Sequence, residues 1–260
     1  MSNLIAVVTH KQVDIPIQKG YQIITVGNNP THYEDALSDR TDDNIAEKNN
    51  HYCELTAQYW LWKNGIEKYD NVGLVHYRRF FGKKRFSAKE SNILSEAEIE
   101  RILQKADIIL PKEFYWPCSV REYYFKHGVG KENDIAIVEE IIKKDYPEYY
   151  NSYIEVMKGN HGSYCNMLIT TNDNFCEYSK WLFDILGKAE TQIDMSEYTP
   201  AEARVFGYLS EILLNVWVKK QGLKIFHAPI LETEYKEKRY YMHVLKRIRV
   251  NFVNELHFLF

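Results

Sequence analysis

Strand-length apolar runs alternate along this chain with segments of helical periodicity, and this order constrains the fold more than any other feature. The alternation favours an α/β domain with a mostly parallel central sheet flanked by helices. Because ligands of such sheets bind where the strands end, we expect the working face at residues 9–11, 76–79 and 111–112. The predicted strands are residues 4–8, 21–26, 72–76, 107–110, 164–170 and 223–226, and the predicted helices are residues 44–64, 95–105, 135–144, 175–186 and 200–221.

Capping residues mark where three of these helices begin. A polar residue followed three positions later by glutamate fits a capping box. Pro200 at a first helical position and Gly222 just past an end mark the last of the three helices further. The capping pairs are Asn44 with Glu47, Ser95 with Glu98, and Thr199 with Glu202.

Length and composition fit one large domain or two small ones, with a sizeable core. The chain has 260 residues, a hydrophobic fraction of 45% and a net charge of −3, which excludes a globally basic nucleic-acid coat. Its four cysteines lack metal-ligand spacing, and the first residues do not resemble a signal peptide. No run approaches the roughly 20 apolar residues that a membrane span needs. We therefore expect a cytoplasmic protein that is at most peripheral on a membrane.

The end of the chain differs from the rest in charge. Residues 236–249 contain six Lys or Arg against one Glu, interleaved with apolar side chains at roughly helical spacing. A basic amphipathic helix suits an anionic membrane surface, but packing of its apolar side on the domain explains the pattern equally well. We divide the chain into a domain over residues 1–232 and a basic helical tail over residues 233–260.

The segment V-G-L-V-H-Y-R-R-F-F, residues 72–81, is the sharpest local feature. A buried strand here ends in His76 and two arginines, Arg78 and Arg79. Guanidinium groups match phosphate oxygens bidentately, so a nucleotide diphosphate is a natural ligand. The alternative is an edge strand whose arginines pair with surface carboxylates. Nucleic acid is not expected, because no basic stripe continues into the neighbouring segments.

Two helices carry polar side chains that suit catalysis. Asn49, Glu54 and Thr56 stand among large rings, although core packing explains most of that helix. Arg204 and Glu211 share one face of the last long helix. A carboxylate beside an arginine suits a general base, and an intrahelical surface network is the alternative.

Support for a metal site is thin. Residues 39–43 form an acidic loop that could hold Mg²⁺ or Mn²⁺ through waters, although helix capping explains Asp43 and Asn44 as well. No metal ligand is therefore assigned, and no cofactor is certain, with Mg²⁺ or Mn²⁺ left open. The motifs of serine hydrolases, P-loop enzymes and Rossmann dehydrogenases do not occur.

Five motifs in fixed order carry a family resemblance across residues 3–232. They are E-L-T-A-Q-Y-W-L-W-K-N, V-G-L-V-H-Y-R-R-F-F, D-I-I-L-P, N-M-L-I and R-V-F-G-Y-L-S-E. The chain resembles the bacterial glycosyltransferases of capsule and exopolysaccharide synthesis, which are catalogued as a domain of unknown function. Characterised members of that family transfer galactofuranose from UDP-galactofuranose with β-1,3 linkage.

The resemblance implies a GT-A-like fold and gives the residues roles. Residues 76–79 occupy the place where many GT-A enzymes carry a metal-binding D-x-D, so Arg78 or Arg79 would neutralise the departing diphosphate. Glu211 would deprotonate the acceptor hydroxyl in an inverting displacement, with Glu54 as the second candidate. Many relatives read S-E-R-L where this chain has S-E-I-L, which changes the surroundings of Glu211. The donor- and substrate-binding candidates are Thr9, His10, Lys11, Asn44, Asn49, Thr56, His76, Tyr77, Asn166 and Arg204.

The resemblance predicts a UDP-sugar donor and a lipid-linked oligosaccharide acceptor in the synthesis of capsule, O-antigen or exopolysaccharide. The alternative is a non-catalytic carbohydrate- or nucleotide-binding subunit of a polysaccharide-assembly complex. The chain's 37 aromatic residues alone suggest carbohydrate only weakly, and the ordered motifs make this a specific expectation. Tyr77, Phe80 and Tyr164 flank strand ends, where they could stack on a sugar or a base.

Overall fold

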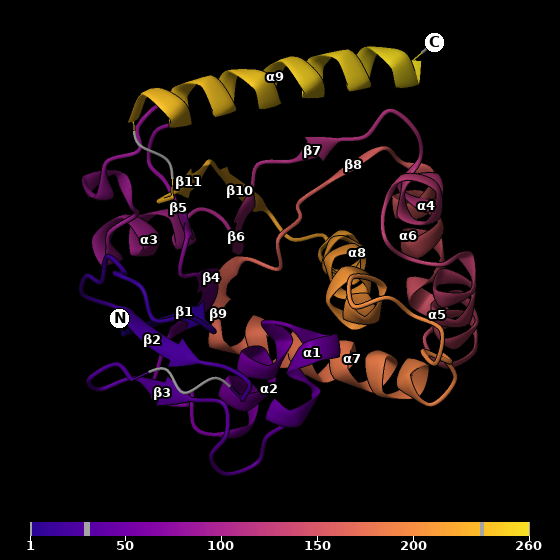
Figure 1. Ribbon diagram of the computed structural model, residues 1–260, viewed down its shortest axis with the longest axis horizontal. Coiled ribbons are helices and arrows are strands. Elements are labelled where there is room, and N and C mark those ends of the chain that lie inside the picture. The colour runs from indigo at the N-terminus through magenta and orange to yellow at the C-terminus, as the bar shows by residue number, and fades with distance from the viewer. Residues whose placement is uncertain (1, 29–31, 235–236, 260) are drawn as a thin grey trace.

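The computed structural model describes residues 2–28, 32–234 and 237–259 (Figure 1). Its central sheet has the strand order β10-β6-β9-β4-β1-β2-β3, and all of these strands run in one direction except β9. The predicted α/β fold with a mostly parallel sheet is therefore confirmed. The strands of this path are β1 (Asn3–Thr9), β2 (Tyr21–Thr25), β3 (Leu37–Ser38), β4 (Asn71–His76), β6 (Ile108–Pro111), β9 (Leu168–Thr171) and β10 (Ile225–Ala228).

Two further strand pairs lie beside this path. Strand β5 (Arg79–Phe81) follows β4 in a tight turn and pairs with β11 (Ile230–Glu232). Strands β7 (Phe114–Tyr115) and β8 (His161–Gly162) form a separate two-stranded sheet. The turn from β4 into β5 directs the sequence H-Y-R-R to the carboxyl end of the sheet, as predicted.

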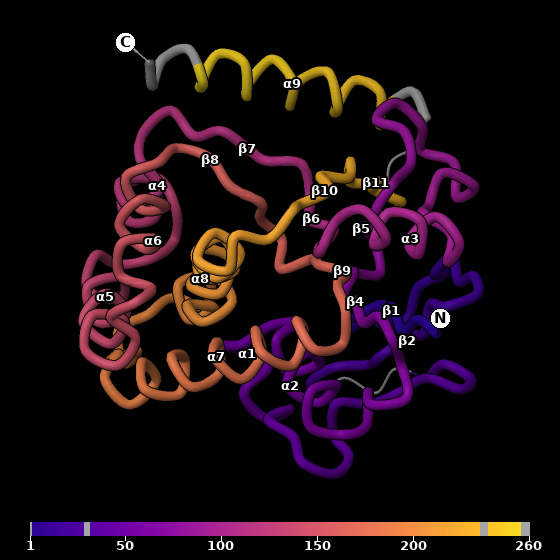
Figure 2. Tube along the Cα trace, turned by 180° about the vertical axis from the view of Figure 1, so that it is seen from behind, coloured from indigo at the N-terminus to yellow at the C-terminus, as the bar shows by residue number. Residues whose placement is uncertain are grey.

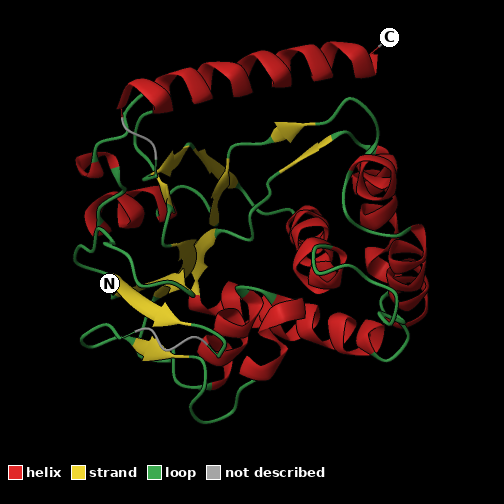
Figure 3. Cartoon of the chain, viewed as in Figure 1, coloured by secondary structure: helices red, strands yellow, loops and turns green. Residues whose placement is uncertain are grey.

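Helices cover both faces of the sheet (Figure 3). Helices α2, α7 and α8 contribute to a large core on one face, and α3 contributes to a smaller core on the other. Short 3₁₀ turns occupy residues 46–48, 90–92 and 202–204, and a π-helical turn occupies Tyr123–His127. The helices are α1 (Asn49–Tyr52), α2 (Leu55–Lys63), α3 (Glu96–Leu103), α4 (Val120–Glu122), α5 (Glu132–Asp145), α6 (Pro147–Lys158), α7 (Asn172–Glu190), α8 (Val205–Gln221) and α9 (Glu237–Leu259).

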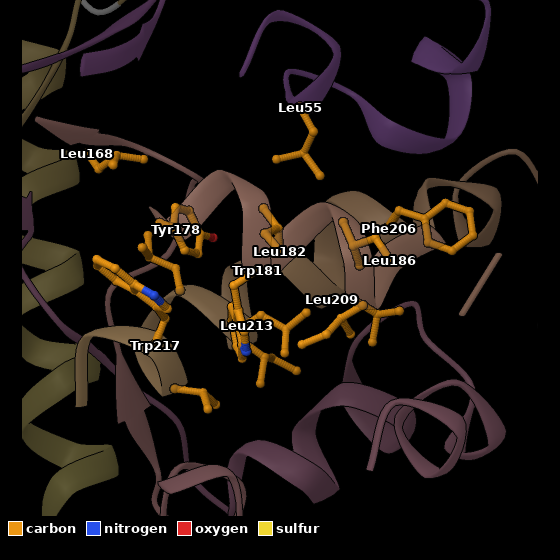
Figure 4. Packing of buried hydrophobic residues seen from close by; sticks show 14 of the residues in the cluster. Leu55, Leu168, Tyr178, Trp181, Leu182, Leu186, Phe206, Leu209, Leu213 and Trp217 are labelled. Carbon is orange, nitrogen blue, oxygen red and sulfur yellow. The ribbon is translucent and has the colours of Figure 1, made fainter. Parts of the chain in front are cut away.

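Burial of the sheet on both faces explains why its strands read as continuous apolar runs. All seven residues of β1 are buried, and alternate side chains enter the two cores. In the larger core, α7 and α8 place Tyr178 and Trp217 with ring centroids 5.3 Å apart (Figure 4). This packing fixes α8 against α7, which itself contacts β4 and β9, and α8 carries Glu211.

Three of the differences between the predicted and observed elements lie beside the cavity described in the next subsection. The helix expected over residues 44–64 breaks at Cys53, whose φ is 54°. The strand expected to begin at residue 164 begins at Leu168, because Cys165 and Asn166 adopt φ values of 83° and 47°. The helix predicted from Pro200 starts with a 3₁₀ turn and becomes α-helical only at Val205. A positive φ at a residue other than glycine costs free energy, and such residues cluster at functional sites.

The capping predictions are confirmed at two helices and wrong at one. Ser95 and Glu98 form the predicted capping box, and Glu202 accepts hydrogen bonds from the backbone N–H and hydroxyl of Thr199. Asn44 instead accepts the N–H of Ala46, and no bond from Glu47 accompanies it. A capping box needs the first turn of an α-helix, in which the third helical residue bonds back to the capping residue. Residues 46–48 form a short 3₁₀ turn instead, so Glu47 does not occupy that position.

The C-terminal tail forms the single long helix α9, which packs on the domain (Figure 2). The buried Tyr240 donates its hydroxyl to the carbonyl of Ile230, at 2.9 Å. Further along, the side-chain amide of Asn254 donates to the carbonyl of Tyr115 in β7, at 2.8 Å. Lys236, the first residue of the predicted basic stretch, lies outside the described residues. None of the helices that the structure describes is long and apolar enough to cross a bilayer.

Candidate active site

A cavity of about 780 Å³ opens at the carboxyl ends of β1 and β4. It lies where two of the three predicted loops meet, at residues 9–11 and 76–79. The third loop, residues 111–112, does not line it, because Lys112 lies on the side facing α9, next to Asn251. The predicted site residues that line the cavity are His10, Lys11, Asn49, Glu54, His76, Tyr77, Arg78, Arg79, Arg204 and Glu211.

Four predicted binding residues do not line the cavity, and three of them, all but Asn44, bond to residues that do. Thr9 is fully buried and bonds to the backbone of Lys11, while Asn44 bonds to the backbone around it. Thr56 is buried and accepts a hydrogen bond from Asn49. Asn166 is also buried, directly behind the carboxylates described next. Phe80, predicted to stack on a ligand, is fully buried in the smaller core and cannot do so.

Two carboxylates face the cavity, that of Glu54 from the residue before α2 and that of Glu211 from α8. The backbone N–H of Cys165 donates to Glu211 Oε1 at 2.7 Å, and the side-chain amide of Asn166 donates to Glu54 Oε1 at 2.8 Å. Both donors belong to the turn with positive φ before β9. That turn therefore holds the two acidic groups in fixed orientations, which explains the retention of its unfavourable backbone conformation.

Asn166 is in turn held by α8. Its amide also donates to the carbonyl of Gly207, and its oxygen accepts the hydroxyl of Ser210, at 2.9 Å in both bonds. Gly207 permits the close approach of α8 to the break at Cys53, since a Cβ at Gly207 would lie 3.1 Å from Cys53 Sγ. The buried amide thus links the helix that carries Glu211 to the segment that carries Glu54.

The pKa of Glu211 is raised to about 7, primarily by burial and secondarily by the nearby negative charge of Glu54. The Cys165 N–H and the cations Arg79 and Arg204 oppose this shift. Burial also lowers the pKa of His76, whose Nε2 lies 2.6 Å from the carbonyl oxygen of Cys165. A carboxylate with a pKa near neutrality is suited to accept a proton from a hydroxyl and to release it again.

Cationic side chains surround the acidic pair. Arg79 is half-buried and its Nε lies 3.8 Å from Glu232 Oε1, whereas the more exposed Arg78 pairs with Glu234 at 3.2 Å. Arg204 donates from Nε to Cys53 Sγ at 3.1 Å. Burial and the neighbouring positive charges of Lys11 and the arginines lower the pKa of His10. The cavity therefore combines a positive rim with a proton-accepting carboxylate.

The acidic loop at residues 39–43 is not part of this cavity. Asp39 is buried and accepts the backbone N–H of Gly27, and Asp43 accepts the hydroxyl of Tyr59. Across the described ranges, no three or more His, Cys, Asp or Glu side chains are grouped so that they could hold a metal ion. The carboxylates of this loop thus stabilise local structure.

Several lining residues have no sequence signal. Cys53 and Cys165 border the two carboxylates, and both owe their position to positive φ angles. His51 bonds through Nδ1 to the carbonyl of Ala203 and joins the walls on either side of the entrance. Positive φ at a cysteine cannot be predicted from periodicity, since glycine and asparagine are its usual markers.

Comparison with known proteins shows the family. The family described as a domain of unknown function, DUF4422, matches residues 4–222. The chain belongs to this family. No curated protein matches the chain.

A solved structure described as the WbbM bifunctional glycosyltransferase, in its apo form, is similar to this DUF4422 chain with a TM-score of 0.83 and 31% identity. The similarity covers 90% of this chain and 46% of that one, so the chain spans about half the length of that enzyme. It confirms the GT-A-like fold. A structure of the mannosyltransferase Ktr4p from S. cerevisiae matches with 9% identity and a TM-score of 0.34, over 72% of this chain and 61% of that one, which is too distant to carry an argument.

Proposed function

We propose that this DUF4422 chain is an inverting glycosyltransferase. The observation that carries the proposal is the meeting of a proton-accepting carboxylate, Glu211, with a cationic rim in one cavity. The similarity to WbbM supports the same activity class. The donor is a UDP-sugar, with UDP-galactofuranose as the first candidate. The acceptor is a lipid-linked oligosaccharide in the synthesis of capsule, O-antigen or exopolysaccharide.

The proposed reaction is a single displacement at the anomeric carbon. Glu211 takes the proton of the acceptor hydroxyl as its oxygen bonds to that carbon. The bond from the carbon to the diphosphate oxygen breaks on the opposite face, and UDP leaves with the bonding electrons. Arg79, with Arg78 nearer the rim, neutralises the charge that develops on the diphosphate. Attack opposite to the leaving group inverts the configuration.

The residues around the diphosphate position do not fit a divalent cation. The turn after β4 supplies His76, Arg78 and Arg79, and each cavity carboxylate already accepts one protein hydrogen bond. Like charge disfavours a second cation beside these arginines. We therefore assign leaving-group stabilisation to the arginines alone.

Release of the nucleoside diphosphate from a panel of UDP-, GDP- and dTDP-sugars tests the function directly. We expect one UDP-sugar to raise the melting temperature and to release UDP slowly without acceptor, because bound ligand stabilises the folded state. We expect EDTA to leave this activity within about twofold of the untreated rate, given arginine stabilisation. Complete loss with EDTA and recovery with Mn²⁺ would contradict the arginine role. Binding without UDP release would favour the non-catalytic subunit.

The solvent-exposed face of α9 supports a proposed contact with the inner face of the cell membrane, which is anionic. Met242 and Phe252 are 64% and 61% exposed, and Arg239, Lys246 and Arg249 are exposed on the same helix. Exposed apolar side chains flanked by cations suit the interface of an anionic bilayer. Such a contact would bring the cavity close to a lipid-linked acceptor.

Co-sedimentation with vesicles tests this contact. We expect the chain to bind phosphatidylglycerol vesicles more strongly than phosphatidylcholine vesicles, since only the former are anionic. Replacing Met242 and Phe252 together by serine should lower binding by about tenfold or more, because two large apolar side chains no longer insert. Equal binding to both vesicle types, or no effect of the double substitution, would contradict the contact.

A further inference from the structure

A second cavity, of about 360 Å³, also adjoins Glu211. Glu211 lines both cavities, so one carboxylate faces two chambers of different chemistry. The first chamber is rich in cations. The second is walled mainly by aromatic rings, those of Trp116, Tyr123, Tyr164 and Tyr208. Its volume falls within the roughly 300–1,000 Å³ of small-molecule sites.

The rings of Trp116 and Tyr123 form a stacked platform, and the ring of Tyr164 borders it. Trp116 and Tyr123 stack with centroids 3.5 Å apart and planes 21° apart, and Tyr164 meets Trp116 nearly edge-on at 5.4 Å. All three are half-buried, so each leaves part of its surface free. Flat aromatic faces with polar edges suit the apolar faces and hydroxyls of sugar rings.

The wall beside this platform is held in an irregular conformation. Tyr123 begins a π-helical turn, a feature that is frequent at functional sites. The loop that follows passes so close to Tyr124 that a Cβ at Gly130 would lie 2.0 Å from its ring. Tyr124 is itself fixed by a hydrogen bond to the buried Asp134. The chamber is therefore preformed.

The platform is also braced from outside by α9. The backbone of Trp116 is paired with Asn160 in both directions, at 2.6 and 3.2 Å. Its neighbour Tyr115 is held through N–H and carbonyl by Asn251 and Asn254 of α9. A rigid ring platform costs little ordering when a ligand binds.

Charge selects the class of ligand. Among the described residues that line the chamber, Glu211 is the acidic one and His127 the one that can become cationic. A phosphate group would therefore find little compensation there, and the arginines of the first chamber are far better suited to it. The second chamber suits a neutral, hydroxylated ring.

We propose that the aromatic chamber binds the acceptor sugar, a neutral hexose residue at the end of the acceptor glycan, and presents one hydroxyl to Glu211. This proposal rests on the proposed transferase function and assigns the second substrate of that site. The two substrates then approach the carboxylate from two different cavities. That arrangement places the acceptor hydroxyl between its base and the donor's anomeric carbon, as an inverting displacement requires.

The test separates acceptor binding from donor chemistry. The probes are octyl β-D-galactoside, octyl β-D-glucoside and octyl α-D-mannoside, with the donor that releases UDP in the panel above. Saturation-transfer NMR in the presence of UDP measures glycoside binding, and UDP release measures turnover with and without glycoside. The variants are Trp116→Leu, the ring-preserving Trp116→Phe and the control Trp62→Leu. Trp62 stacks on Phe183 at 5.9 Å and lines neither cavity.

We expect at least one glycoside to bind the wild-type chain and to serve as acceptor. Trp116→Leu should raise the acceptor KM about tenfold, as expected for loss of a stacking contact, and leave acceptor-free UDP release within about twofold. The acceptor KM of Trp116→Phe should lie between those of wild type and Trp116→Leu, and the acceptor KM of Trp62→Leu should match that of wild type. Melting temperatures verify that the variants are folded.

Two results would overturn the subsite. One is that no glycoside binds the wild-type chain in the presence of UDP. The other is that Trp116→Leu leaves both glycoside binding and acceptor KM unchanged in an active enzyme. Failure of the transferase function looks different, because wild type would then release no UDP from any donor. Loss of glycoside binding in Trp116→Leu would still support the sugar site in that case.

Discussion

Glu211→Gln is expected to lower the turnover of sugar transfer by about 10²- to 10⁴-fold, the usual contribution of a general base. The amide keeps an oxygen that can accept the Cys165 N–H, now at 2.7 Å, so the local geometry can persist. Only the capacity to take the acceptor proton is lost. Donor binding, followed by the UDP-induced rise in melting temperature, should stay close to wild type.

The pH dependence of wild type and of Glu211→Gln is a second test of the role of the Glu211 carboxyl. In wild type, kcat/KM should rise as Glu211 loses its proton around pH 7, because burial and Glu54 raise its pKa to about 7. In Glu211→Gln this rise should vanish and only a low, flat rate should remain. A rising limb that persists in the variant would assign the base role to another group, with Glu54 first.

The raised pKa also makes Glu211 costly for stability. The carboxyl of Glu211 binds its proton more tightly in the folded state than in the unfolded state, where its pKa has the ordinary value of 4.5. The free energy of unfolding therefore falls as pH rises from about 4.5 to 7. Above pH 7 the full penalty applies. Glu211→Gln avoids it, and its free energy of unfolding should exceed that of wild type by about 1–3 kcal/mol at pH 8 and by little at pH 4.5.

Glu155→Gln is the matched control. Glu155 lies on α6 and forms an exposed pair with Lys219 of α8, so its loss should change turnover and stability very little. Near-normal turnover of Glu211→Gln would remove the base assignment. Low turnover accompanied by a lowered melting temperature at pH 8 would instead indicate a structural role for Glu211.

The sequence predicted the fold through features that depend on burial and spacing. Strands buried on both faces must be apolar throughout, so β1 and β4 were recognisable as runs. The H-Y-R-R segment directly follows such a run, which placed Arg78 and Arg79 at the working edge. Ordinary helix signals identified the segment around Glu211, although the α-helix itself begins later than predicted.

The sequence could not predict the breaks that shape the site. Cys53, Cys165 and Asn166 adopt positive φ only because tertiary contacts hold them there, and helical periodicity continues through Cys53 as if no break existed. For the same reason Asn166 was expected beside a substrate, whereas it is buried and orients Glu54. The aromatic chamber assembles rings from the residue after β7, the π-turn, the loop before β9 and α8, and no local pattern joins those four segments.

Arg79→Gln is expected to lower kcat for UDP release by about 10²- to 10³-fold, comparable to the loss of one donor that stabilises charge in a transition state. The structure distinguishes it from Arg78. Arg79 is the more buried of the two and lies close enough to Glu211 to lower that carboxyl's pKa, whereas Arg78 pairs with the exposed Glu234 at the rim. Arg78→Gln should therefore act chiefly on the donor KM, by about tenfold.

The loss of Arg79 also leaves Glu232 without its 3.8 Å guanidinium partner, so a drop in turnover could reflect a disturbed β5–β11 pair instead of lost charge neutralisation. The double variant Arg79→Gln with Glu232→Gln separates the two causes, since it also removes the carboxylate that Arg79 contacts. Without Arg79, that carboxylate keeps a contact with His243 Nε2 at 2.9 Å. If the diphosphate depends on Arg79, the double variant regains the wild-type melting temperature but not kcat. Recovery of both would make Arg79 a structural residue, and Arg79→Lys should then be as active as wild type. In the leaving-group role, lysine keeps the charge but lacks the bidentate fork, so it should restore only part of the rate.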